Sequence, residues 1–118
     1  MPKEKHLKKA IIWVKKKQIV SIKATAEGYD NPKIFVSKST KEEIQPDLTF
    51  TTQSGAKHYS EVALKDDNER KLVVRWKVLS FLASMKRGKL HLLAPKGHKD
   101  FTQRIVTLHK INAIVHEL

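Results

Sequence analysis

The spacing of hydrophobic residues predicts a helix and then a strand at the start of the chain. Apolar side chains recur at helical intervals over residues 3–18, and lysines fill most other positions, which is typical of a basic amphipathic helix. Residues 19–24 alternate between apolar and polar, as a half-buried strand does. Glycine, aspartate, asparagine and proline over residues 27–32 then indicate a turn. Residues 33–44 have the weakest pattern, and we expect a short strand and a mobile polar loop there.

The second half of the chain predicts two further helices, each followed by a strand. Acidic and amide side chains at 66–69 favour a helix start, and the helix continues to about Arg87, with Gly88 as its cap. This helix is apolar around most of its circumference, including Phe81 and Met85, so we expect it to be the central core helix. There follow a strand, a helix with Phe101, Ile105 and Leu108 inward, and a last strand, at residues 90–94, 100–110 and 112–116.

Residues 45–65, between these two halves, predict a β-hairpin. Residues 53–55, Gln-Ser-Gly, suit a three-residue loop whose final glycine adopts the left-handed conformation. The two residues that flank this loop then pair with each other, which fixes the register of the strands. In that register Asp47 lies directly opposite Glu61, on the same face of the hairpin.

The hairpin therefore has one acidic face and one apolar face. Two opposed carboxylates destabilise a strand pair unless a charge compensates them, and a divalent cation bound by both is the usual compensation. We interpret Asp47 and Glu61 as metal ligands; the alternative is that both are exposed carboxylates on a half-solvated sheet. His58 is expected on the other side, away from the acids. That apolar side comprises Pro46, Leu48, Phe50, Val62 and Leu64.

Composition predicts one folded, basic domain over residues 1–118. Lysine and arginine total 24 against 12 acidic residues, which gives a net charge of +12 and makes polyanions the natural partners. The chain has no cysteine, so disulfides, thiolate zinc sites and cysteine nucleophiles are excluded. The longest early apolar run is too short for a signal peptide or a membrane span, so we expect a cytoplasmic protein without membrane association.

The predicted order begins with a basic helix, three strands forming a meander, a core helix and a further strand. Pro46-Asp47 opens the second strand, and Glu61 lies in the third. This arrangement resembles the PD-(D/E)XK nuclease superfamily. The resemblance covers nearly the whole chain. It implies a restriction endonuclease-like fold of the α/β (α+β) class, a mixed β-sheet flanked by helices in the order α-β-β-β-α-β-α-β. It also implies that Asp47 and Glu61 hold a divalent metal, Mg²⁺ or Mn²⁺, at the scissile phosphate.

The sequence departs from that family pattern at the catalytic cation. The pattern places a lysine two residues after the second acid, where this chain has Ala63. The resemblance therefore implies Lys65 as the cation, with Lys71 or Arg75 on the following helix as alternatives. Two further acids are candidates for a third metal ligand, Glu4 and Glu27.

Several other charged residues can be assigned either a functional or a purely structural role. Lys15, Lys16 and Lys17 end the first helix and form either a phosphate-contacting surface or a solvated face. Asp66 and Asp67 are interpreted as helix caps, with outer-sphere metal contacts as the alternative.

Three functions are compatible with these observations. The first is a metal-dependent endonuclease that hydrolyses phosphodiester bonds in DNA or, as the second choice, in RNA. The second is a nuclease-like fold without turnover that binds nucleic acid, because Ala63 replaces the expected lysine. The third is a protein-interaction subunit whose charge only keeps it in solution. A domain of this size has little surface for sequence readout, so specificity would require a homodimer or a partner protein.

Overall fold

Helices and strands follow one another in the predicted order, with one additional small hairpin. A computed structural model describes residues 2–38, 41–65 and 67–118. Its elements are α1 (Pro2–Lys15), β1 (Ile19–Ala24), β2 (Phe35–Val36), β3 (Glu43–Ile44), β4 (Leu48–Thr52), β5 (Lys57–Val62), α2 (Glu69–Met85), β6 (Leu90–Ala94), α3 (Lys99–Leu108) and β7 (Ala113–Glu117). β2 and β3 form the additional hairpin, in the segment where we expected one short strand and a loop.

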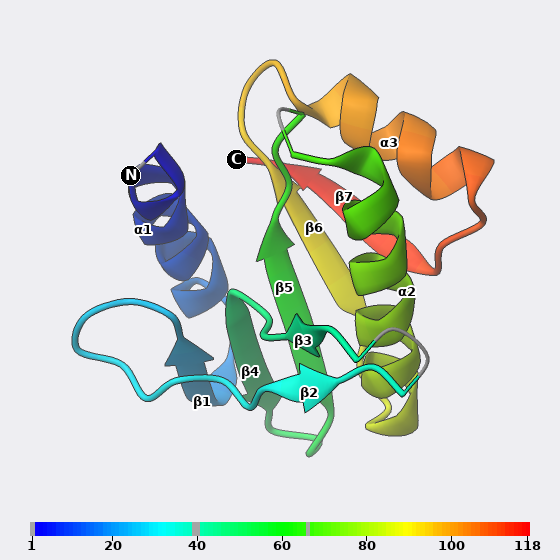
Figure 1. Ribbon diagram of the computed structural model, residues 1–118. Coiled ribbons are helices and arrows are strands. Elements are labelled where there is room, and N and C mark those ends of the chain that lie inside the picture. Colours follow the sequence, from blue (N-terminus) through cyan, green and yellow to red (C-terminus); the bar gives the residue numbers. More distant parts are fainter. Residues whose placement is uncertain (1, 39–40, 66) are drawn as a thin grey trace.

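Five strands form one mixed sheet in the order β1-β4-β5-β6-β7 (Figure 1). β1, β4 and β5 pair antiparallel, whereas β5, β6 and β7 are parallel and are joined through α2 and α3, because parallel neighbours need a crossover. α1 packs on one face of the sheet, and α2 and α3 pack on the other. The predicted mixed sheet flanked by helices is confirmed.

The β4–β5 hairpin has the predicted turn and register. The Thr52 amide donates to the Ala56 carbonyl at 3.0 Å, and Gly55 adopts the left-handed conformation with φ of 87°. The ladder then continues away from the loop without a shift. Asp47 therefore lies opposite Glu61, as the loop chemistry alone predicts.

Both faces of this hairpin are buried. On the apolar face, Leu48, Phe50 and Val62 pack under α1 and are at most 2% exposed. On the acidic face, Asp47 is 6% exposed and Glu61 is 1% exposed. The alternative of two exposed carboxylates on a half-solvated sheet is therefore wrong.

α2 begins where predicted but buries only one side. Asn68 is its N-cap, with the side-chain oxygen accepting from the Lys71 amide at 3.1 Å. Phe81 and Met85 are each 63% exposed, so the expectation that they lie in the core is wrong. The sheet covers one stripe of the helix, and the buried residues on that stripe are Leu72, Trp76, Leu79 and Ala83.

The end of α2 also differs from the expectation. The helix ends at Met85, and the residue with positive φ (63°) is Arg87, not Gly88. A Cβ atom at Gly88 would lie 1.8 Å from the Lys57 carbonyl oxygen. Gly88 is therefore required for the close approach of this turn to the backbone of β5, not for a left-handed cap.

α3 is rotated slightly from the predicted orientation. Thr102, Ile105 and Val106 face inward, whereas Leu108 is 63% exposed. The placement of Ile105 is confirmed and that of Leu108 is wrong, because the buried side of the helix is centred on Thr102, Ile105 and Val106 and Leu108 lies off that side.

Three histidines form a hydrogen-bonded row across β5, β6 and β7, on the face that α1 covers. His91 lies in the middle, with Nε2 3.2 Å from His58 Nδ1 and Nδ1 3.0 Å from His116 Nε2. Trp13 of α1 packs against His116, with ring centroids 4.7 Å apart. His58 thus lies on the predicted side, but the row joins three strands and has no signature in the sequence.

A backbone amide fixes the direction of this row. The Lys89 amide donates to His58 Nδ1 at 3.1 Å, so that nitrogen is an acceptor. His91 then donates through Nε2 and accepts from His116 through Nδ1, which is consistent with neutral rings throughout. Burial, with the neighbouring histidines and with Lys17 and Lys89, lowers the pKa of His91 to about 3.

We predict that Gly88→Ala destabilises the protein by about 3 kcal/mol or more, because the added methyl group collides with the backbone of β5. Gly28→Ala is the control: nothing lies within 4 Å of its Cβ position, and only the left-handed backbone costs about 1–2 kcal/mol. Urea denaturation of both variants measures the difference. A smaller loss for Gly88→Ala than for Gly28→Ala would contradict the close approach.

We also predict that His91 makes the protein less stable in acid. The unfolded chain protonates this ring near pH 6.5, whereas the folded chain keeps it neutral down to about pH 3, so stability falls as the pH drops through that window. His91→Gln removes the titration. Urea denaturation from pH 8 to pH 4 should show that the free-energy difference between variant and wild type is constant above about pH 7 and changes below it. A difference that stays constant throughout would refute the assignment.

Candidate functional site

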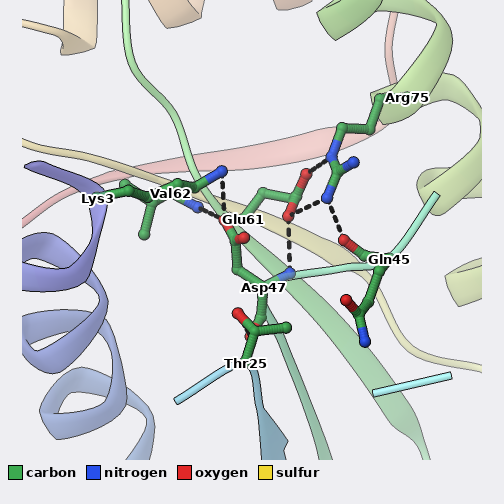
Figure 2. Close-up of polar contacts among 7 residues, drawn as sticks. All are labelled: Lys3, Thr25, Gln45, Asp47, Glu61, Val62 and Arg75. Atoms are coloured by element: carbon green, nitrogen blue, oxygen red, sulfur yellow. Dashed lines mark hydrogen bonds and ion pairs between the residues drawn. The ribbon is translucent and has the colours of Figure 1, made fainter. Parts of the chain in front are cut away.

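Asp47 and Glu61 lie side by side, just before β4 begins and near the end of β5 (Figure 2). The Asp47 amide donates to Glu61 Oε2 at 2.8 Å, and the Val62 amide donates to Asp47 Oδ2 at 2.9 Å. The backbone of each strand thus binds the carboxylate of the other. This reciprocal bonding holds both side chains in place at the end of the ladder.

Two cations, from helices on opposite faces of the sheet, compensate the two acids. Lys3 of α1 has Nζ 3.1 Å from Asp47 Oδ2. Arg75 of α2 forms an ion pair with Glu61 through Nε, and its Nη2 lies 3.2 Å from Glu61 Oε2. The same guanidinium donates to the Gln45 carbonyl. We call Lys3, Asp47, Glu61 and Arg75 the charge quartet; its formal charges sum to zero.

Burial and the mutual interactions of the quartet shift the pKa values of three of its members, Glu61, Arg75 and Lys3. Burial and the charge of Asp47 raise the pKa of Glu61 to about 7, although Arg75 and Lys3 act in the opposite direction. Burial lowers the pKa of Arg75, but the hydrogen bond and charge of Glu61 outweigh it, so the pKa is raised. The pKa of Lys3 is likewise raised, because Asp47 and Glu61 outweigh burial. Strongly perturbed groups beside a cavity are typical of functional sites.

A cavity of about 230 Å³ opens beside Glu61. Water takes roughly 30 Å³ per molecule, so the space holds several waters or one phosphate group. Its charged and polar lining comprises Lys3, Lys71 and Arg75, together with Glu61, Asp67 and Asn68. Three cations and two acids therefore line the cavity, and three members of the quartet, Lys3, Glu61 and Arg75, are among them.

The structure brings two of the three candidate cations to the acids. Arg75 contacts Glu61, and Lys71 lines the cavity one helical turn away. Lys65 is exposed and is outside the cavity lining; its backbone amide donates to His98 Nδ1 at 2.9 Å. The cations on α2 therefore lie closer to the acids than the strand-end lysine does, at the place where the resemblance implies a cation.

The other candidates lie in different places. Glu4 and Glu27 line a separate cavity beside α1, so the structure does not bring either to the quartet. Lys15, Lys16 and Lys17 are exposed at the end of α1, and Lys17 Nζ lies 4.2 Å from the Trp13 ring centroid.

Of the two acids at the start of α2, the structure describes Asp67. Asn68, not Asp67, caps the helix. Asp67 lines the cavity beside Glu61, where an outer-sphere contact to a metal could form. Asp66 lies outside the described residues.

Lys3 is the site residue that sequence reasoning missed. Lysines fill the polar positions of α1, and nothing in the local pattern distinguishes this one. Charge balance indicates only that a second cation is needed, because two buried acids require two cations; it does not say which lysine supplies the charge.

The donor set suits a hard divalent cation. Mg²⁺ is usually held by one or two carboxylates, with waters and phosphate oxygens completing six ligands. Asp47 and Glu61 would supply the carboxylates, and Lys3 and Arg75 would have to give up some of their present contacts. Among the described residues no three histidine, aspartate or glutamate side chains converge as a metal site, so the other ligands would be water and substrate.

Comparison with known protein families, with curated proteins and with solved structures finds no match for this chain. The PD-(D/E)XK resemblance therefore stays a prediction. Within the described part of the chain, no helix combines the length and the apolar character needed to cross a membrane.

We predict that Arg75→Ala destabilises the protein by about 3–5 kcal/mol at pH 8, because the buried Glu61 then either stays charged without its main partner or takes up a proton at a pH far above its pKa in the unfolded chain. The loss should be smaller at pH 5, where Glu61, whose pKa is about 7 even with Arg75 present, takes up a proton. Urea denaturation at both pH values measures the two losses.

The matched control is Arg104→Ala. Arg104 lies 3.3 Å from Glu69 in a surface ion pair, with side chains 58% and 42% exposed, so its loss should cost at most about 1 kcal/mol and respond little to pH. The double variant Arg75→Ala, Glu61→Gln should recover part of the stability. Equal losses for the two arginine variants would show that the quartet does not hold the fold together.

Proposed function

We propose that this chain is a metal-dependent nuclease-like enzyme that hydrolyses phosphodiester bonds in DNA. The observation that carries the proposal is the position of Asp47 and Glu61, buried side by side, with Glu61 on the wall of a cavity that Lys3, Lys71 and Arg75 also line. Phosphodiester hydrolysis needs acids to hold a divalent cation and cations to hold a phosphate at the same point. The net charge of +12 favours a polyanionic substrate.

A restriction endonuclease-like core is part of this proposal. Support for it comes from the chain order: α1, the antiparallel strands β1, β4 and β5, the crossover helix α2 and the parallel strand β6. That order is the one the resemblance implies. Asp47 directly precedes the second strand of the antiparallel set and Glu61 lies on the third, again as implied.

The absence of a lysine at position 63 has a structural reason. Ala63 is fully buried and belongs to the same core cluster as Leu72 and Trp76. A lysine there would carry its charge into that core, which is costly without a partner. Arg75, one helical turn beyond Leu72, reaches Glu61 from α2 instead and supplies the cation.

Each residue then has a stated role. Asp47 and Glu61 would hold the metal, which, when bound, lowers the pKa of a water molecule and offsets charge on the phosphate. Lys3 and Lys71 attract the phosphate into the cavity. The planar guanidinium of Arg75 is suited to hydrogen-bond phosphate oxygens in pairs and so to stabilise negative charge that develops on them.

A second function, nucleic-acid binding without turnover, is favoured by a different observation. Lys3 and Arg75 already neutralise both acids, so the site is stable without a metal. A protein of this kind would bind nucleic acid in the presence of a chelator and would never cut it.

We predict that the purified protein nicks supercoiled plasmid DNA in Mg²⁺ or Mn²⁺. Asp47→Asn and Glu61→Gln should each lower the rate by about 100-fold or more, because each removes a metal-holding carboxylate. Mn²⁺ should also raise the melting temperature of the wild type and not that of the variant that combines Asp47→Asn with Glu61→Gln. Gel electrophoresis and thermal melting measure the two effects.

Glu69→Gln is the control, because Glu69 is a surface acid on α2 that pairs with Arg104, outside the cavity lining. Its nicking rate should equal that of the wild type. Nicking that persists unchanged in both Asp47→Asn and Glu61→Gln would reject the assignment. Salt-sensitive binding with no nicking in any metal would instead establish the second function.

A further inference from the structure

Two lysines lie over a pair of contacting aromatic rings, at the loop end of β5. The ring of Phe35 in β2 packs against that of Tyr59 in β5, with centroids 6.1 Å apart. Lys33 Nζ lies 5.6 Å from the Phe35 centroid, and Lys57 Nζ lies 5.5 Å from the Tyr59 centroid. Because each ammonium group lies over one ring of the pair, the segment before β2 and strand β5 place these two lysines beside the same pair of rings.

Two further lysines reach the same place from other elements. The Lys57 amide donates to the Lys86 carbonyl at 3.2 Å, which brings the residue after α2 against β5. Lys23 in β1 pairs with Thr49, which pairs in turn with Tyr59, so Lys23 lies on the same face of the sheet. We call these four residues the lysine cluster: Lys23, Lys33, Lys57 and Lys86.

The members of the lysine cluster repel one another. Burial lowers the pKa of Lys57, and so do the charges of Lys23, Lys86 and Lys33. Lys3 and Arg75, in contrast, each lie against a carboxylate. Four segments that are distant in sequence have thus brought like charges together, an arrangement that an anionic ligand would stabilise.

We propose that the lysine cluster binds the phosphate backbone of a nucleic acid, at a point separate from the Asp47 and Glu61 site. Lys57 and Glu61 lie on the same face of β5, and four residues of strand span about 13 Å. That distance corresponds to about four base-pair steps along the axis of B-DNA, at roughly 3.4 Å each. Tyr59 is 1% exposed, so its ring is not available to stack on a base, and the contact is with the backbone.

The inference rests on the proposed function only for the identity of the polyanion, and binding without metal tests it separately. The cluster variant combines Lys23→Gln, Lys33→Gln, Lys57→Gln and Lys86→Gln. The control variant combines Lys77→Gln, Lys96→Gln, Lys99→Gln and Lys110→Gln, four exposed lysines elsewhere, so the two variants have the same net charge.

The measurement is fluorescence anisotropy of a labelled DNA duplex of about 20 base pairs, titrated with protein in EDTA over a series of salt concentrations. The cluster variant should bind about tenfold more weakly or worse. Its plot of log affinity against log salt should be shallower by up to about 3.6, since each lost phosphate contact removes about 0.9 from the slope. The control variant should keep most of the affinity and the slope.

Equal changes in the two variants would overturn the inference, because net charge alone would then explain the binding. Loss of binding to phosphatidylserine vesicles without loss of binding to DNA would also overturn it, by identifying a lipid surface as the polyanion. Removing mutual repulsion should leave the melting temperature of the cluster variant at or above that of the wild type. If the full variant unfolds, Lys33→Gln with Lys86→Gln, both at exposed positions, repeats the test with half the expected slope change.

The outcomes also separate this inference from the proposed function. Cluster-specific loss of binding in a protein that never nicks DNA supports the lysine cluster and rejects hydrolysis. Metal-dependent nicking, together with equal DNA binding by the cluster variant and the control variant, supports hydrolysis and rejects the lysine cluster as the binding site.

Discussion

Burial of two carboxylates on adjacent strands is the constraint on which the rest of the structure depends. Asp47 and Glu61 are almost inaccessible to water, and buried charges are tolerated only when they are paired and hydrogen-bonded. Their partners are Lys3 from α1 and Arg75 from α2, on opposite faces of the sheet. Both helices must therefore dock before both acids have their partners. The quartet couples the end of the β-ladder to both covering layers, so formation of the site and formation of the fold are one event.

The hairpin could be predicted from the sequence because its geometry is local. Gly55 closes a loop of known size, the loop fixes which residues oppose one another, and the facing of Asp47 and Glu61 follows without reference to any other element. Whether other elements cover the acidic face of the hairpin is not determined by the local sequence. It depends on where α2 packs after its crossover, and Phe81 and Met85 are as apolar as the residues that the helix buries.

The same limit explains what was missed in the site. Arg75 could be predicted as a candidate because it follows the acids on a predicted helix, but Lys3 is more than forty residues away from Asp47 and resembles every other lysine on α1. Only its contact with Asp47 in the folded protein distinguishes Lys3 from the other lysines of α1. The histidine row has the same origin, because His58, His91 and His116 meet only once β5, β6 and β7 are parallel neighbours. Pairings of this kind are set by strand order, which spacing along the chain does not determine.

The two sets of cations have different electrostatic states, and this difference bears on how a substrate would bind. The lysine cluster can receive phosphates directly, because its charges face one another and gain from any anion. The quartet is already neutral, so a metal and a phosphate can enter only by exchange: the metal replaces the cations at Asp47 and Glu61, and the phosphate takes over Lys3 or Arg75. Such an exchange gives both acids the metal as their partner and gives a released cation the phosphate, so neither acid is left buried alone, which is the outcome that would be most costly. Under the proposed function the counter-ions of the free protein therefore become the phosphate ligands of the complex, and Arg75 serves both states because Ala63 leaves no room for a separate catalytic lysine.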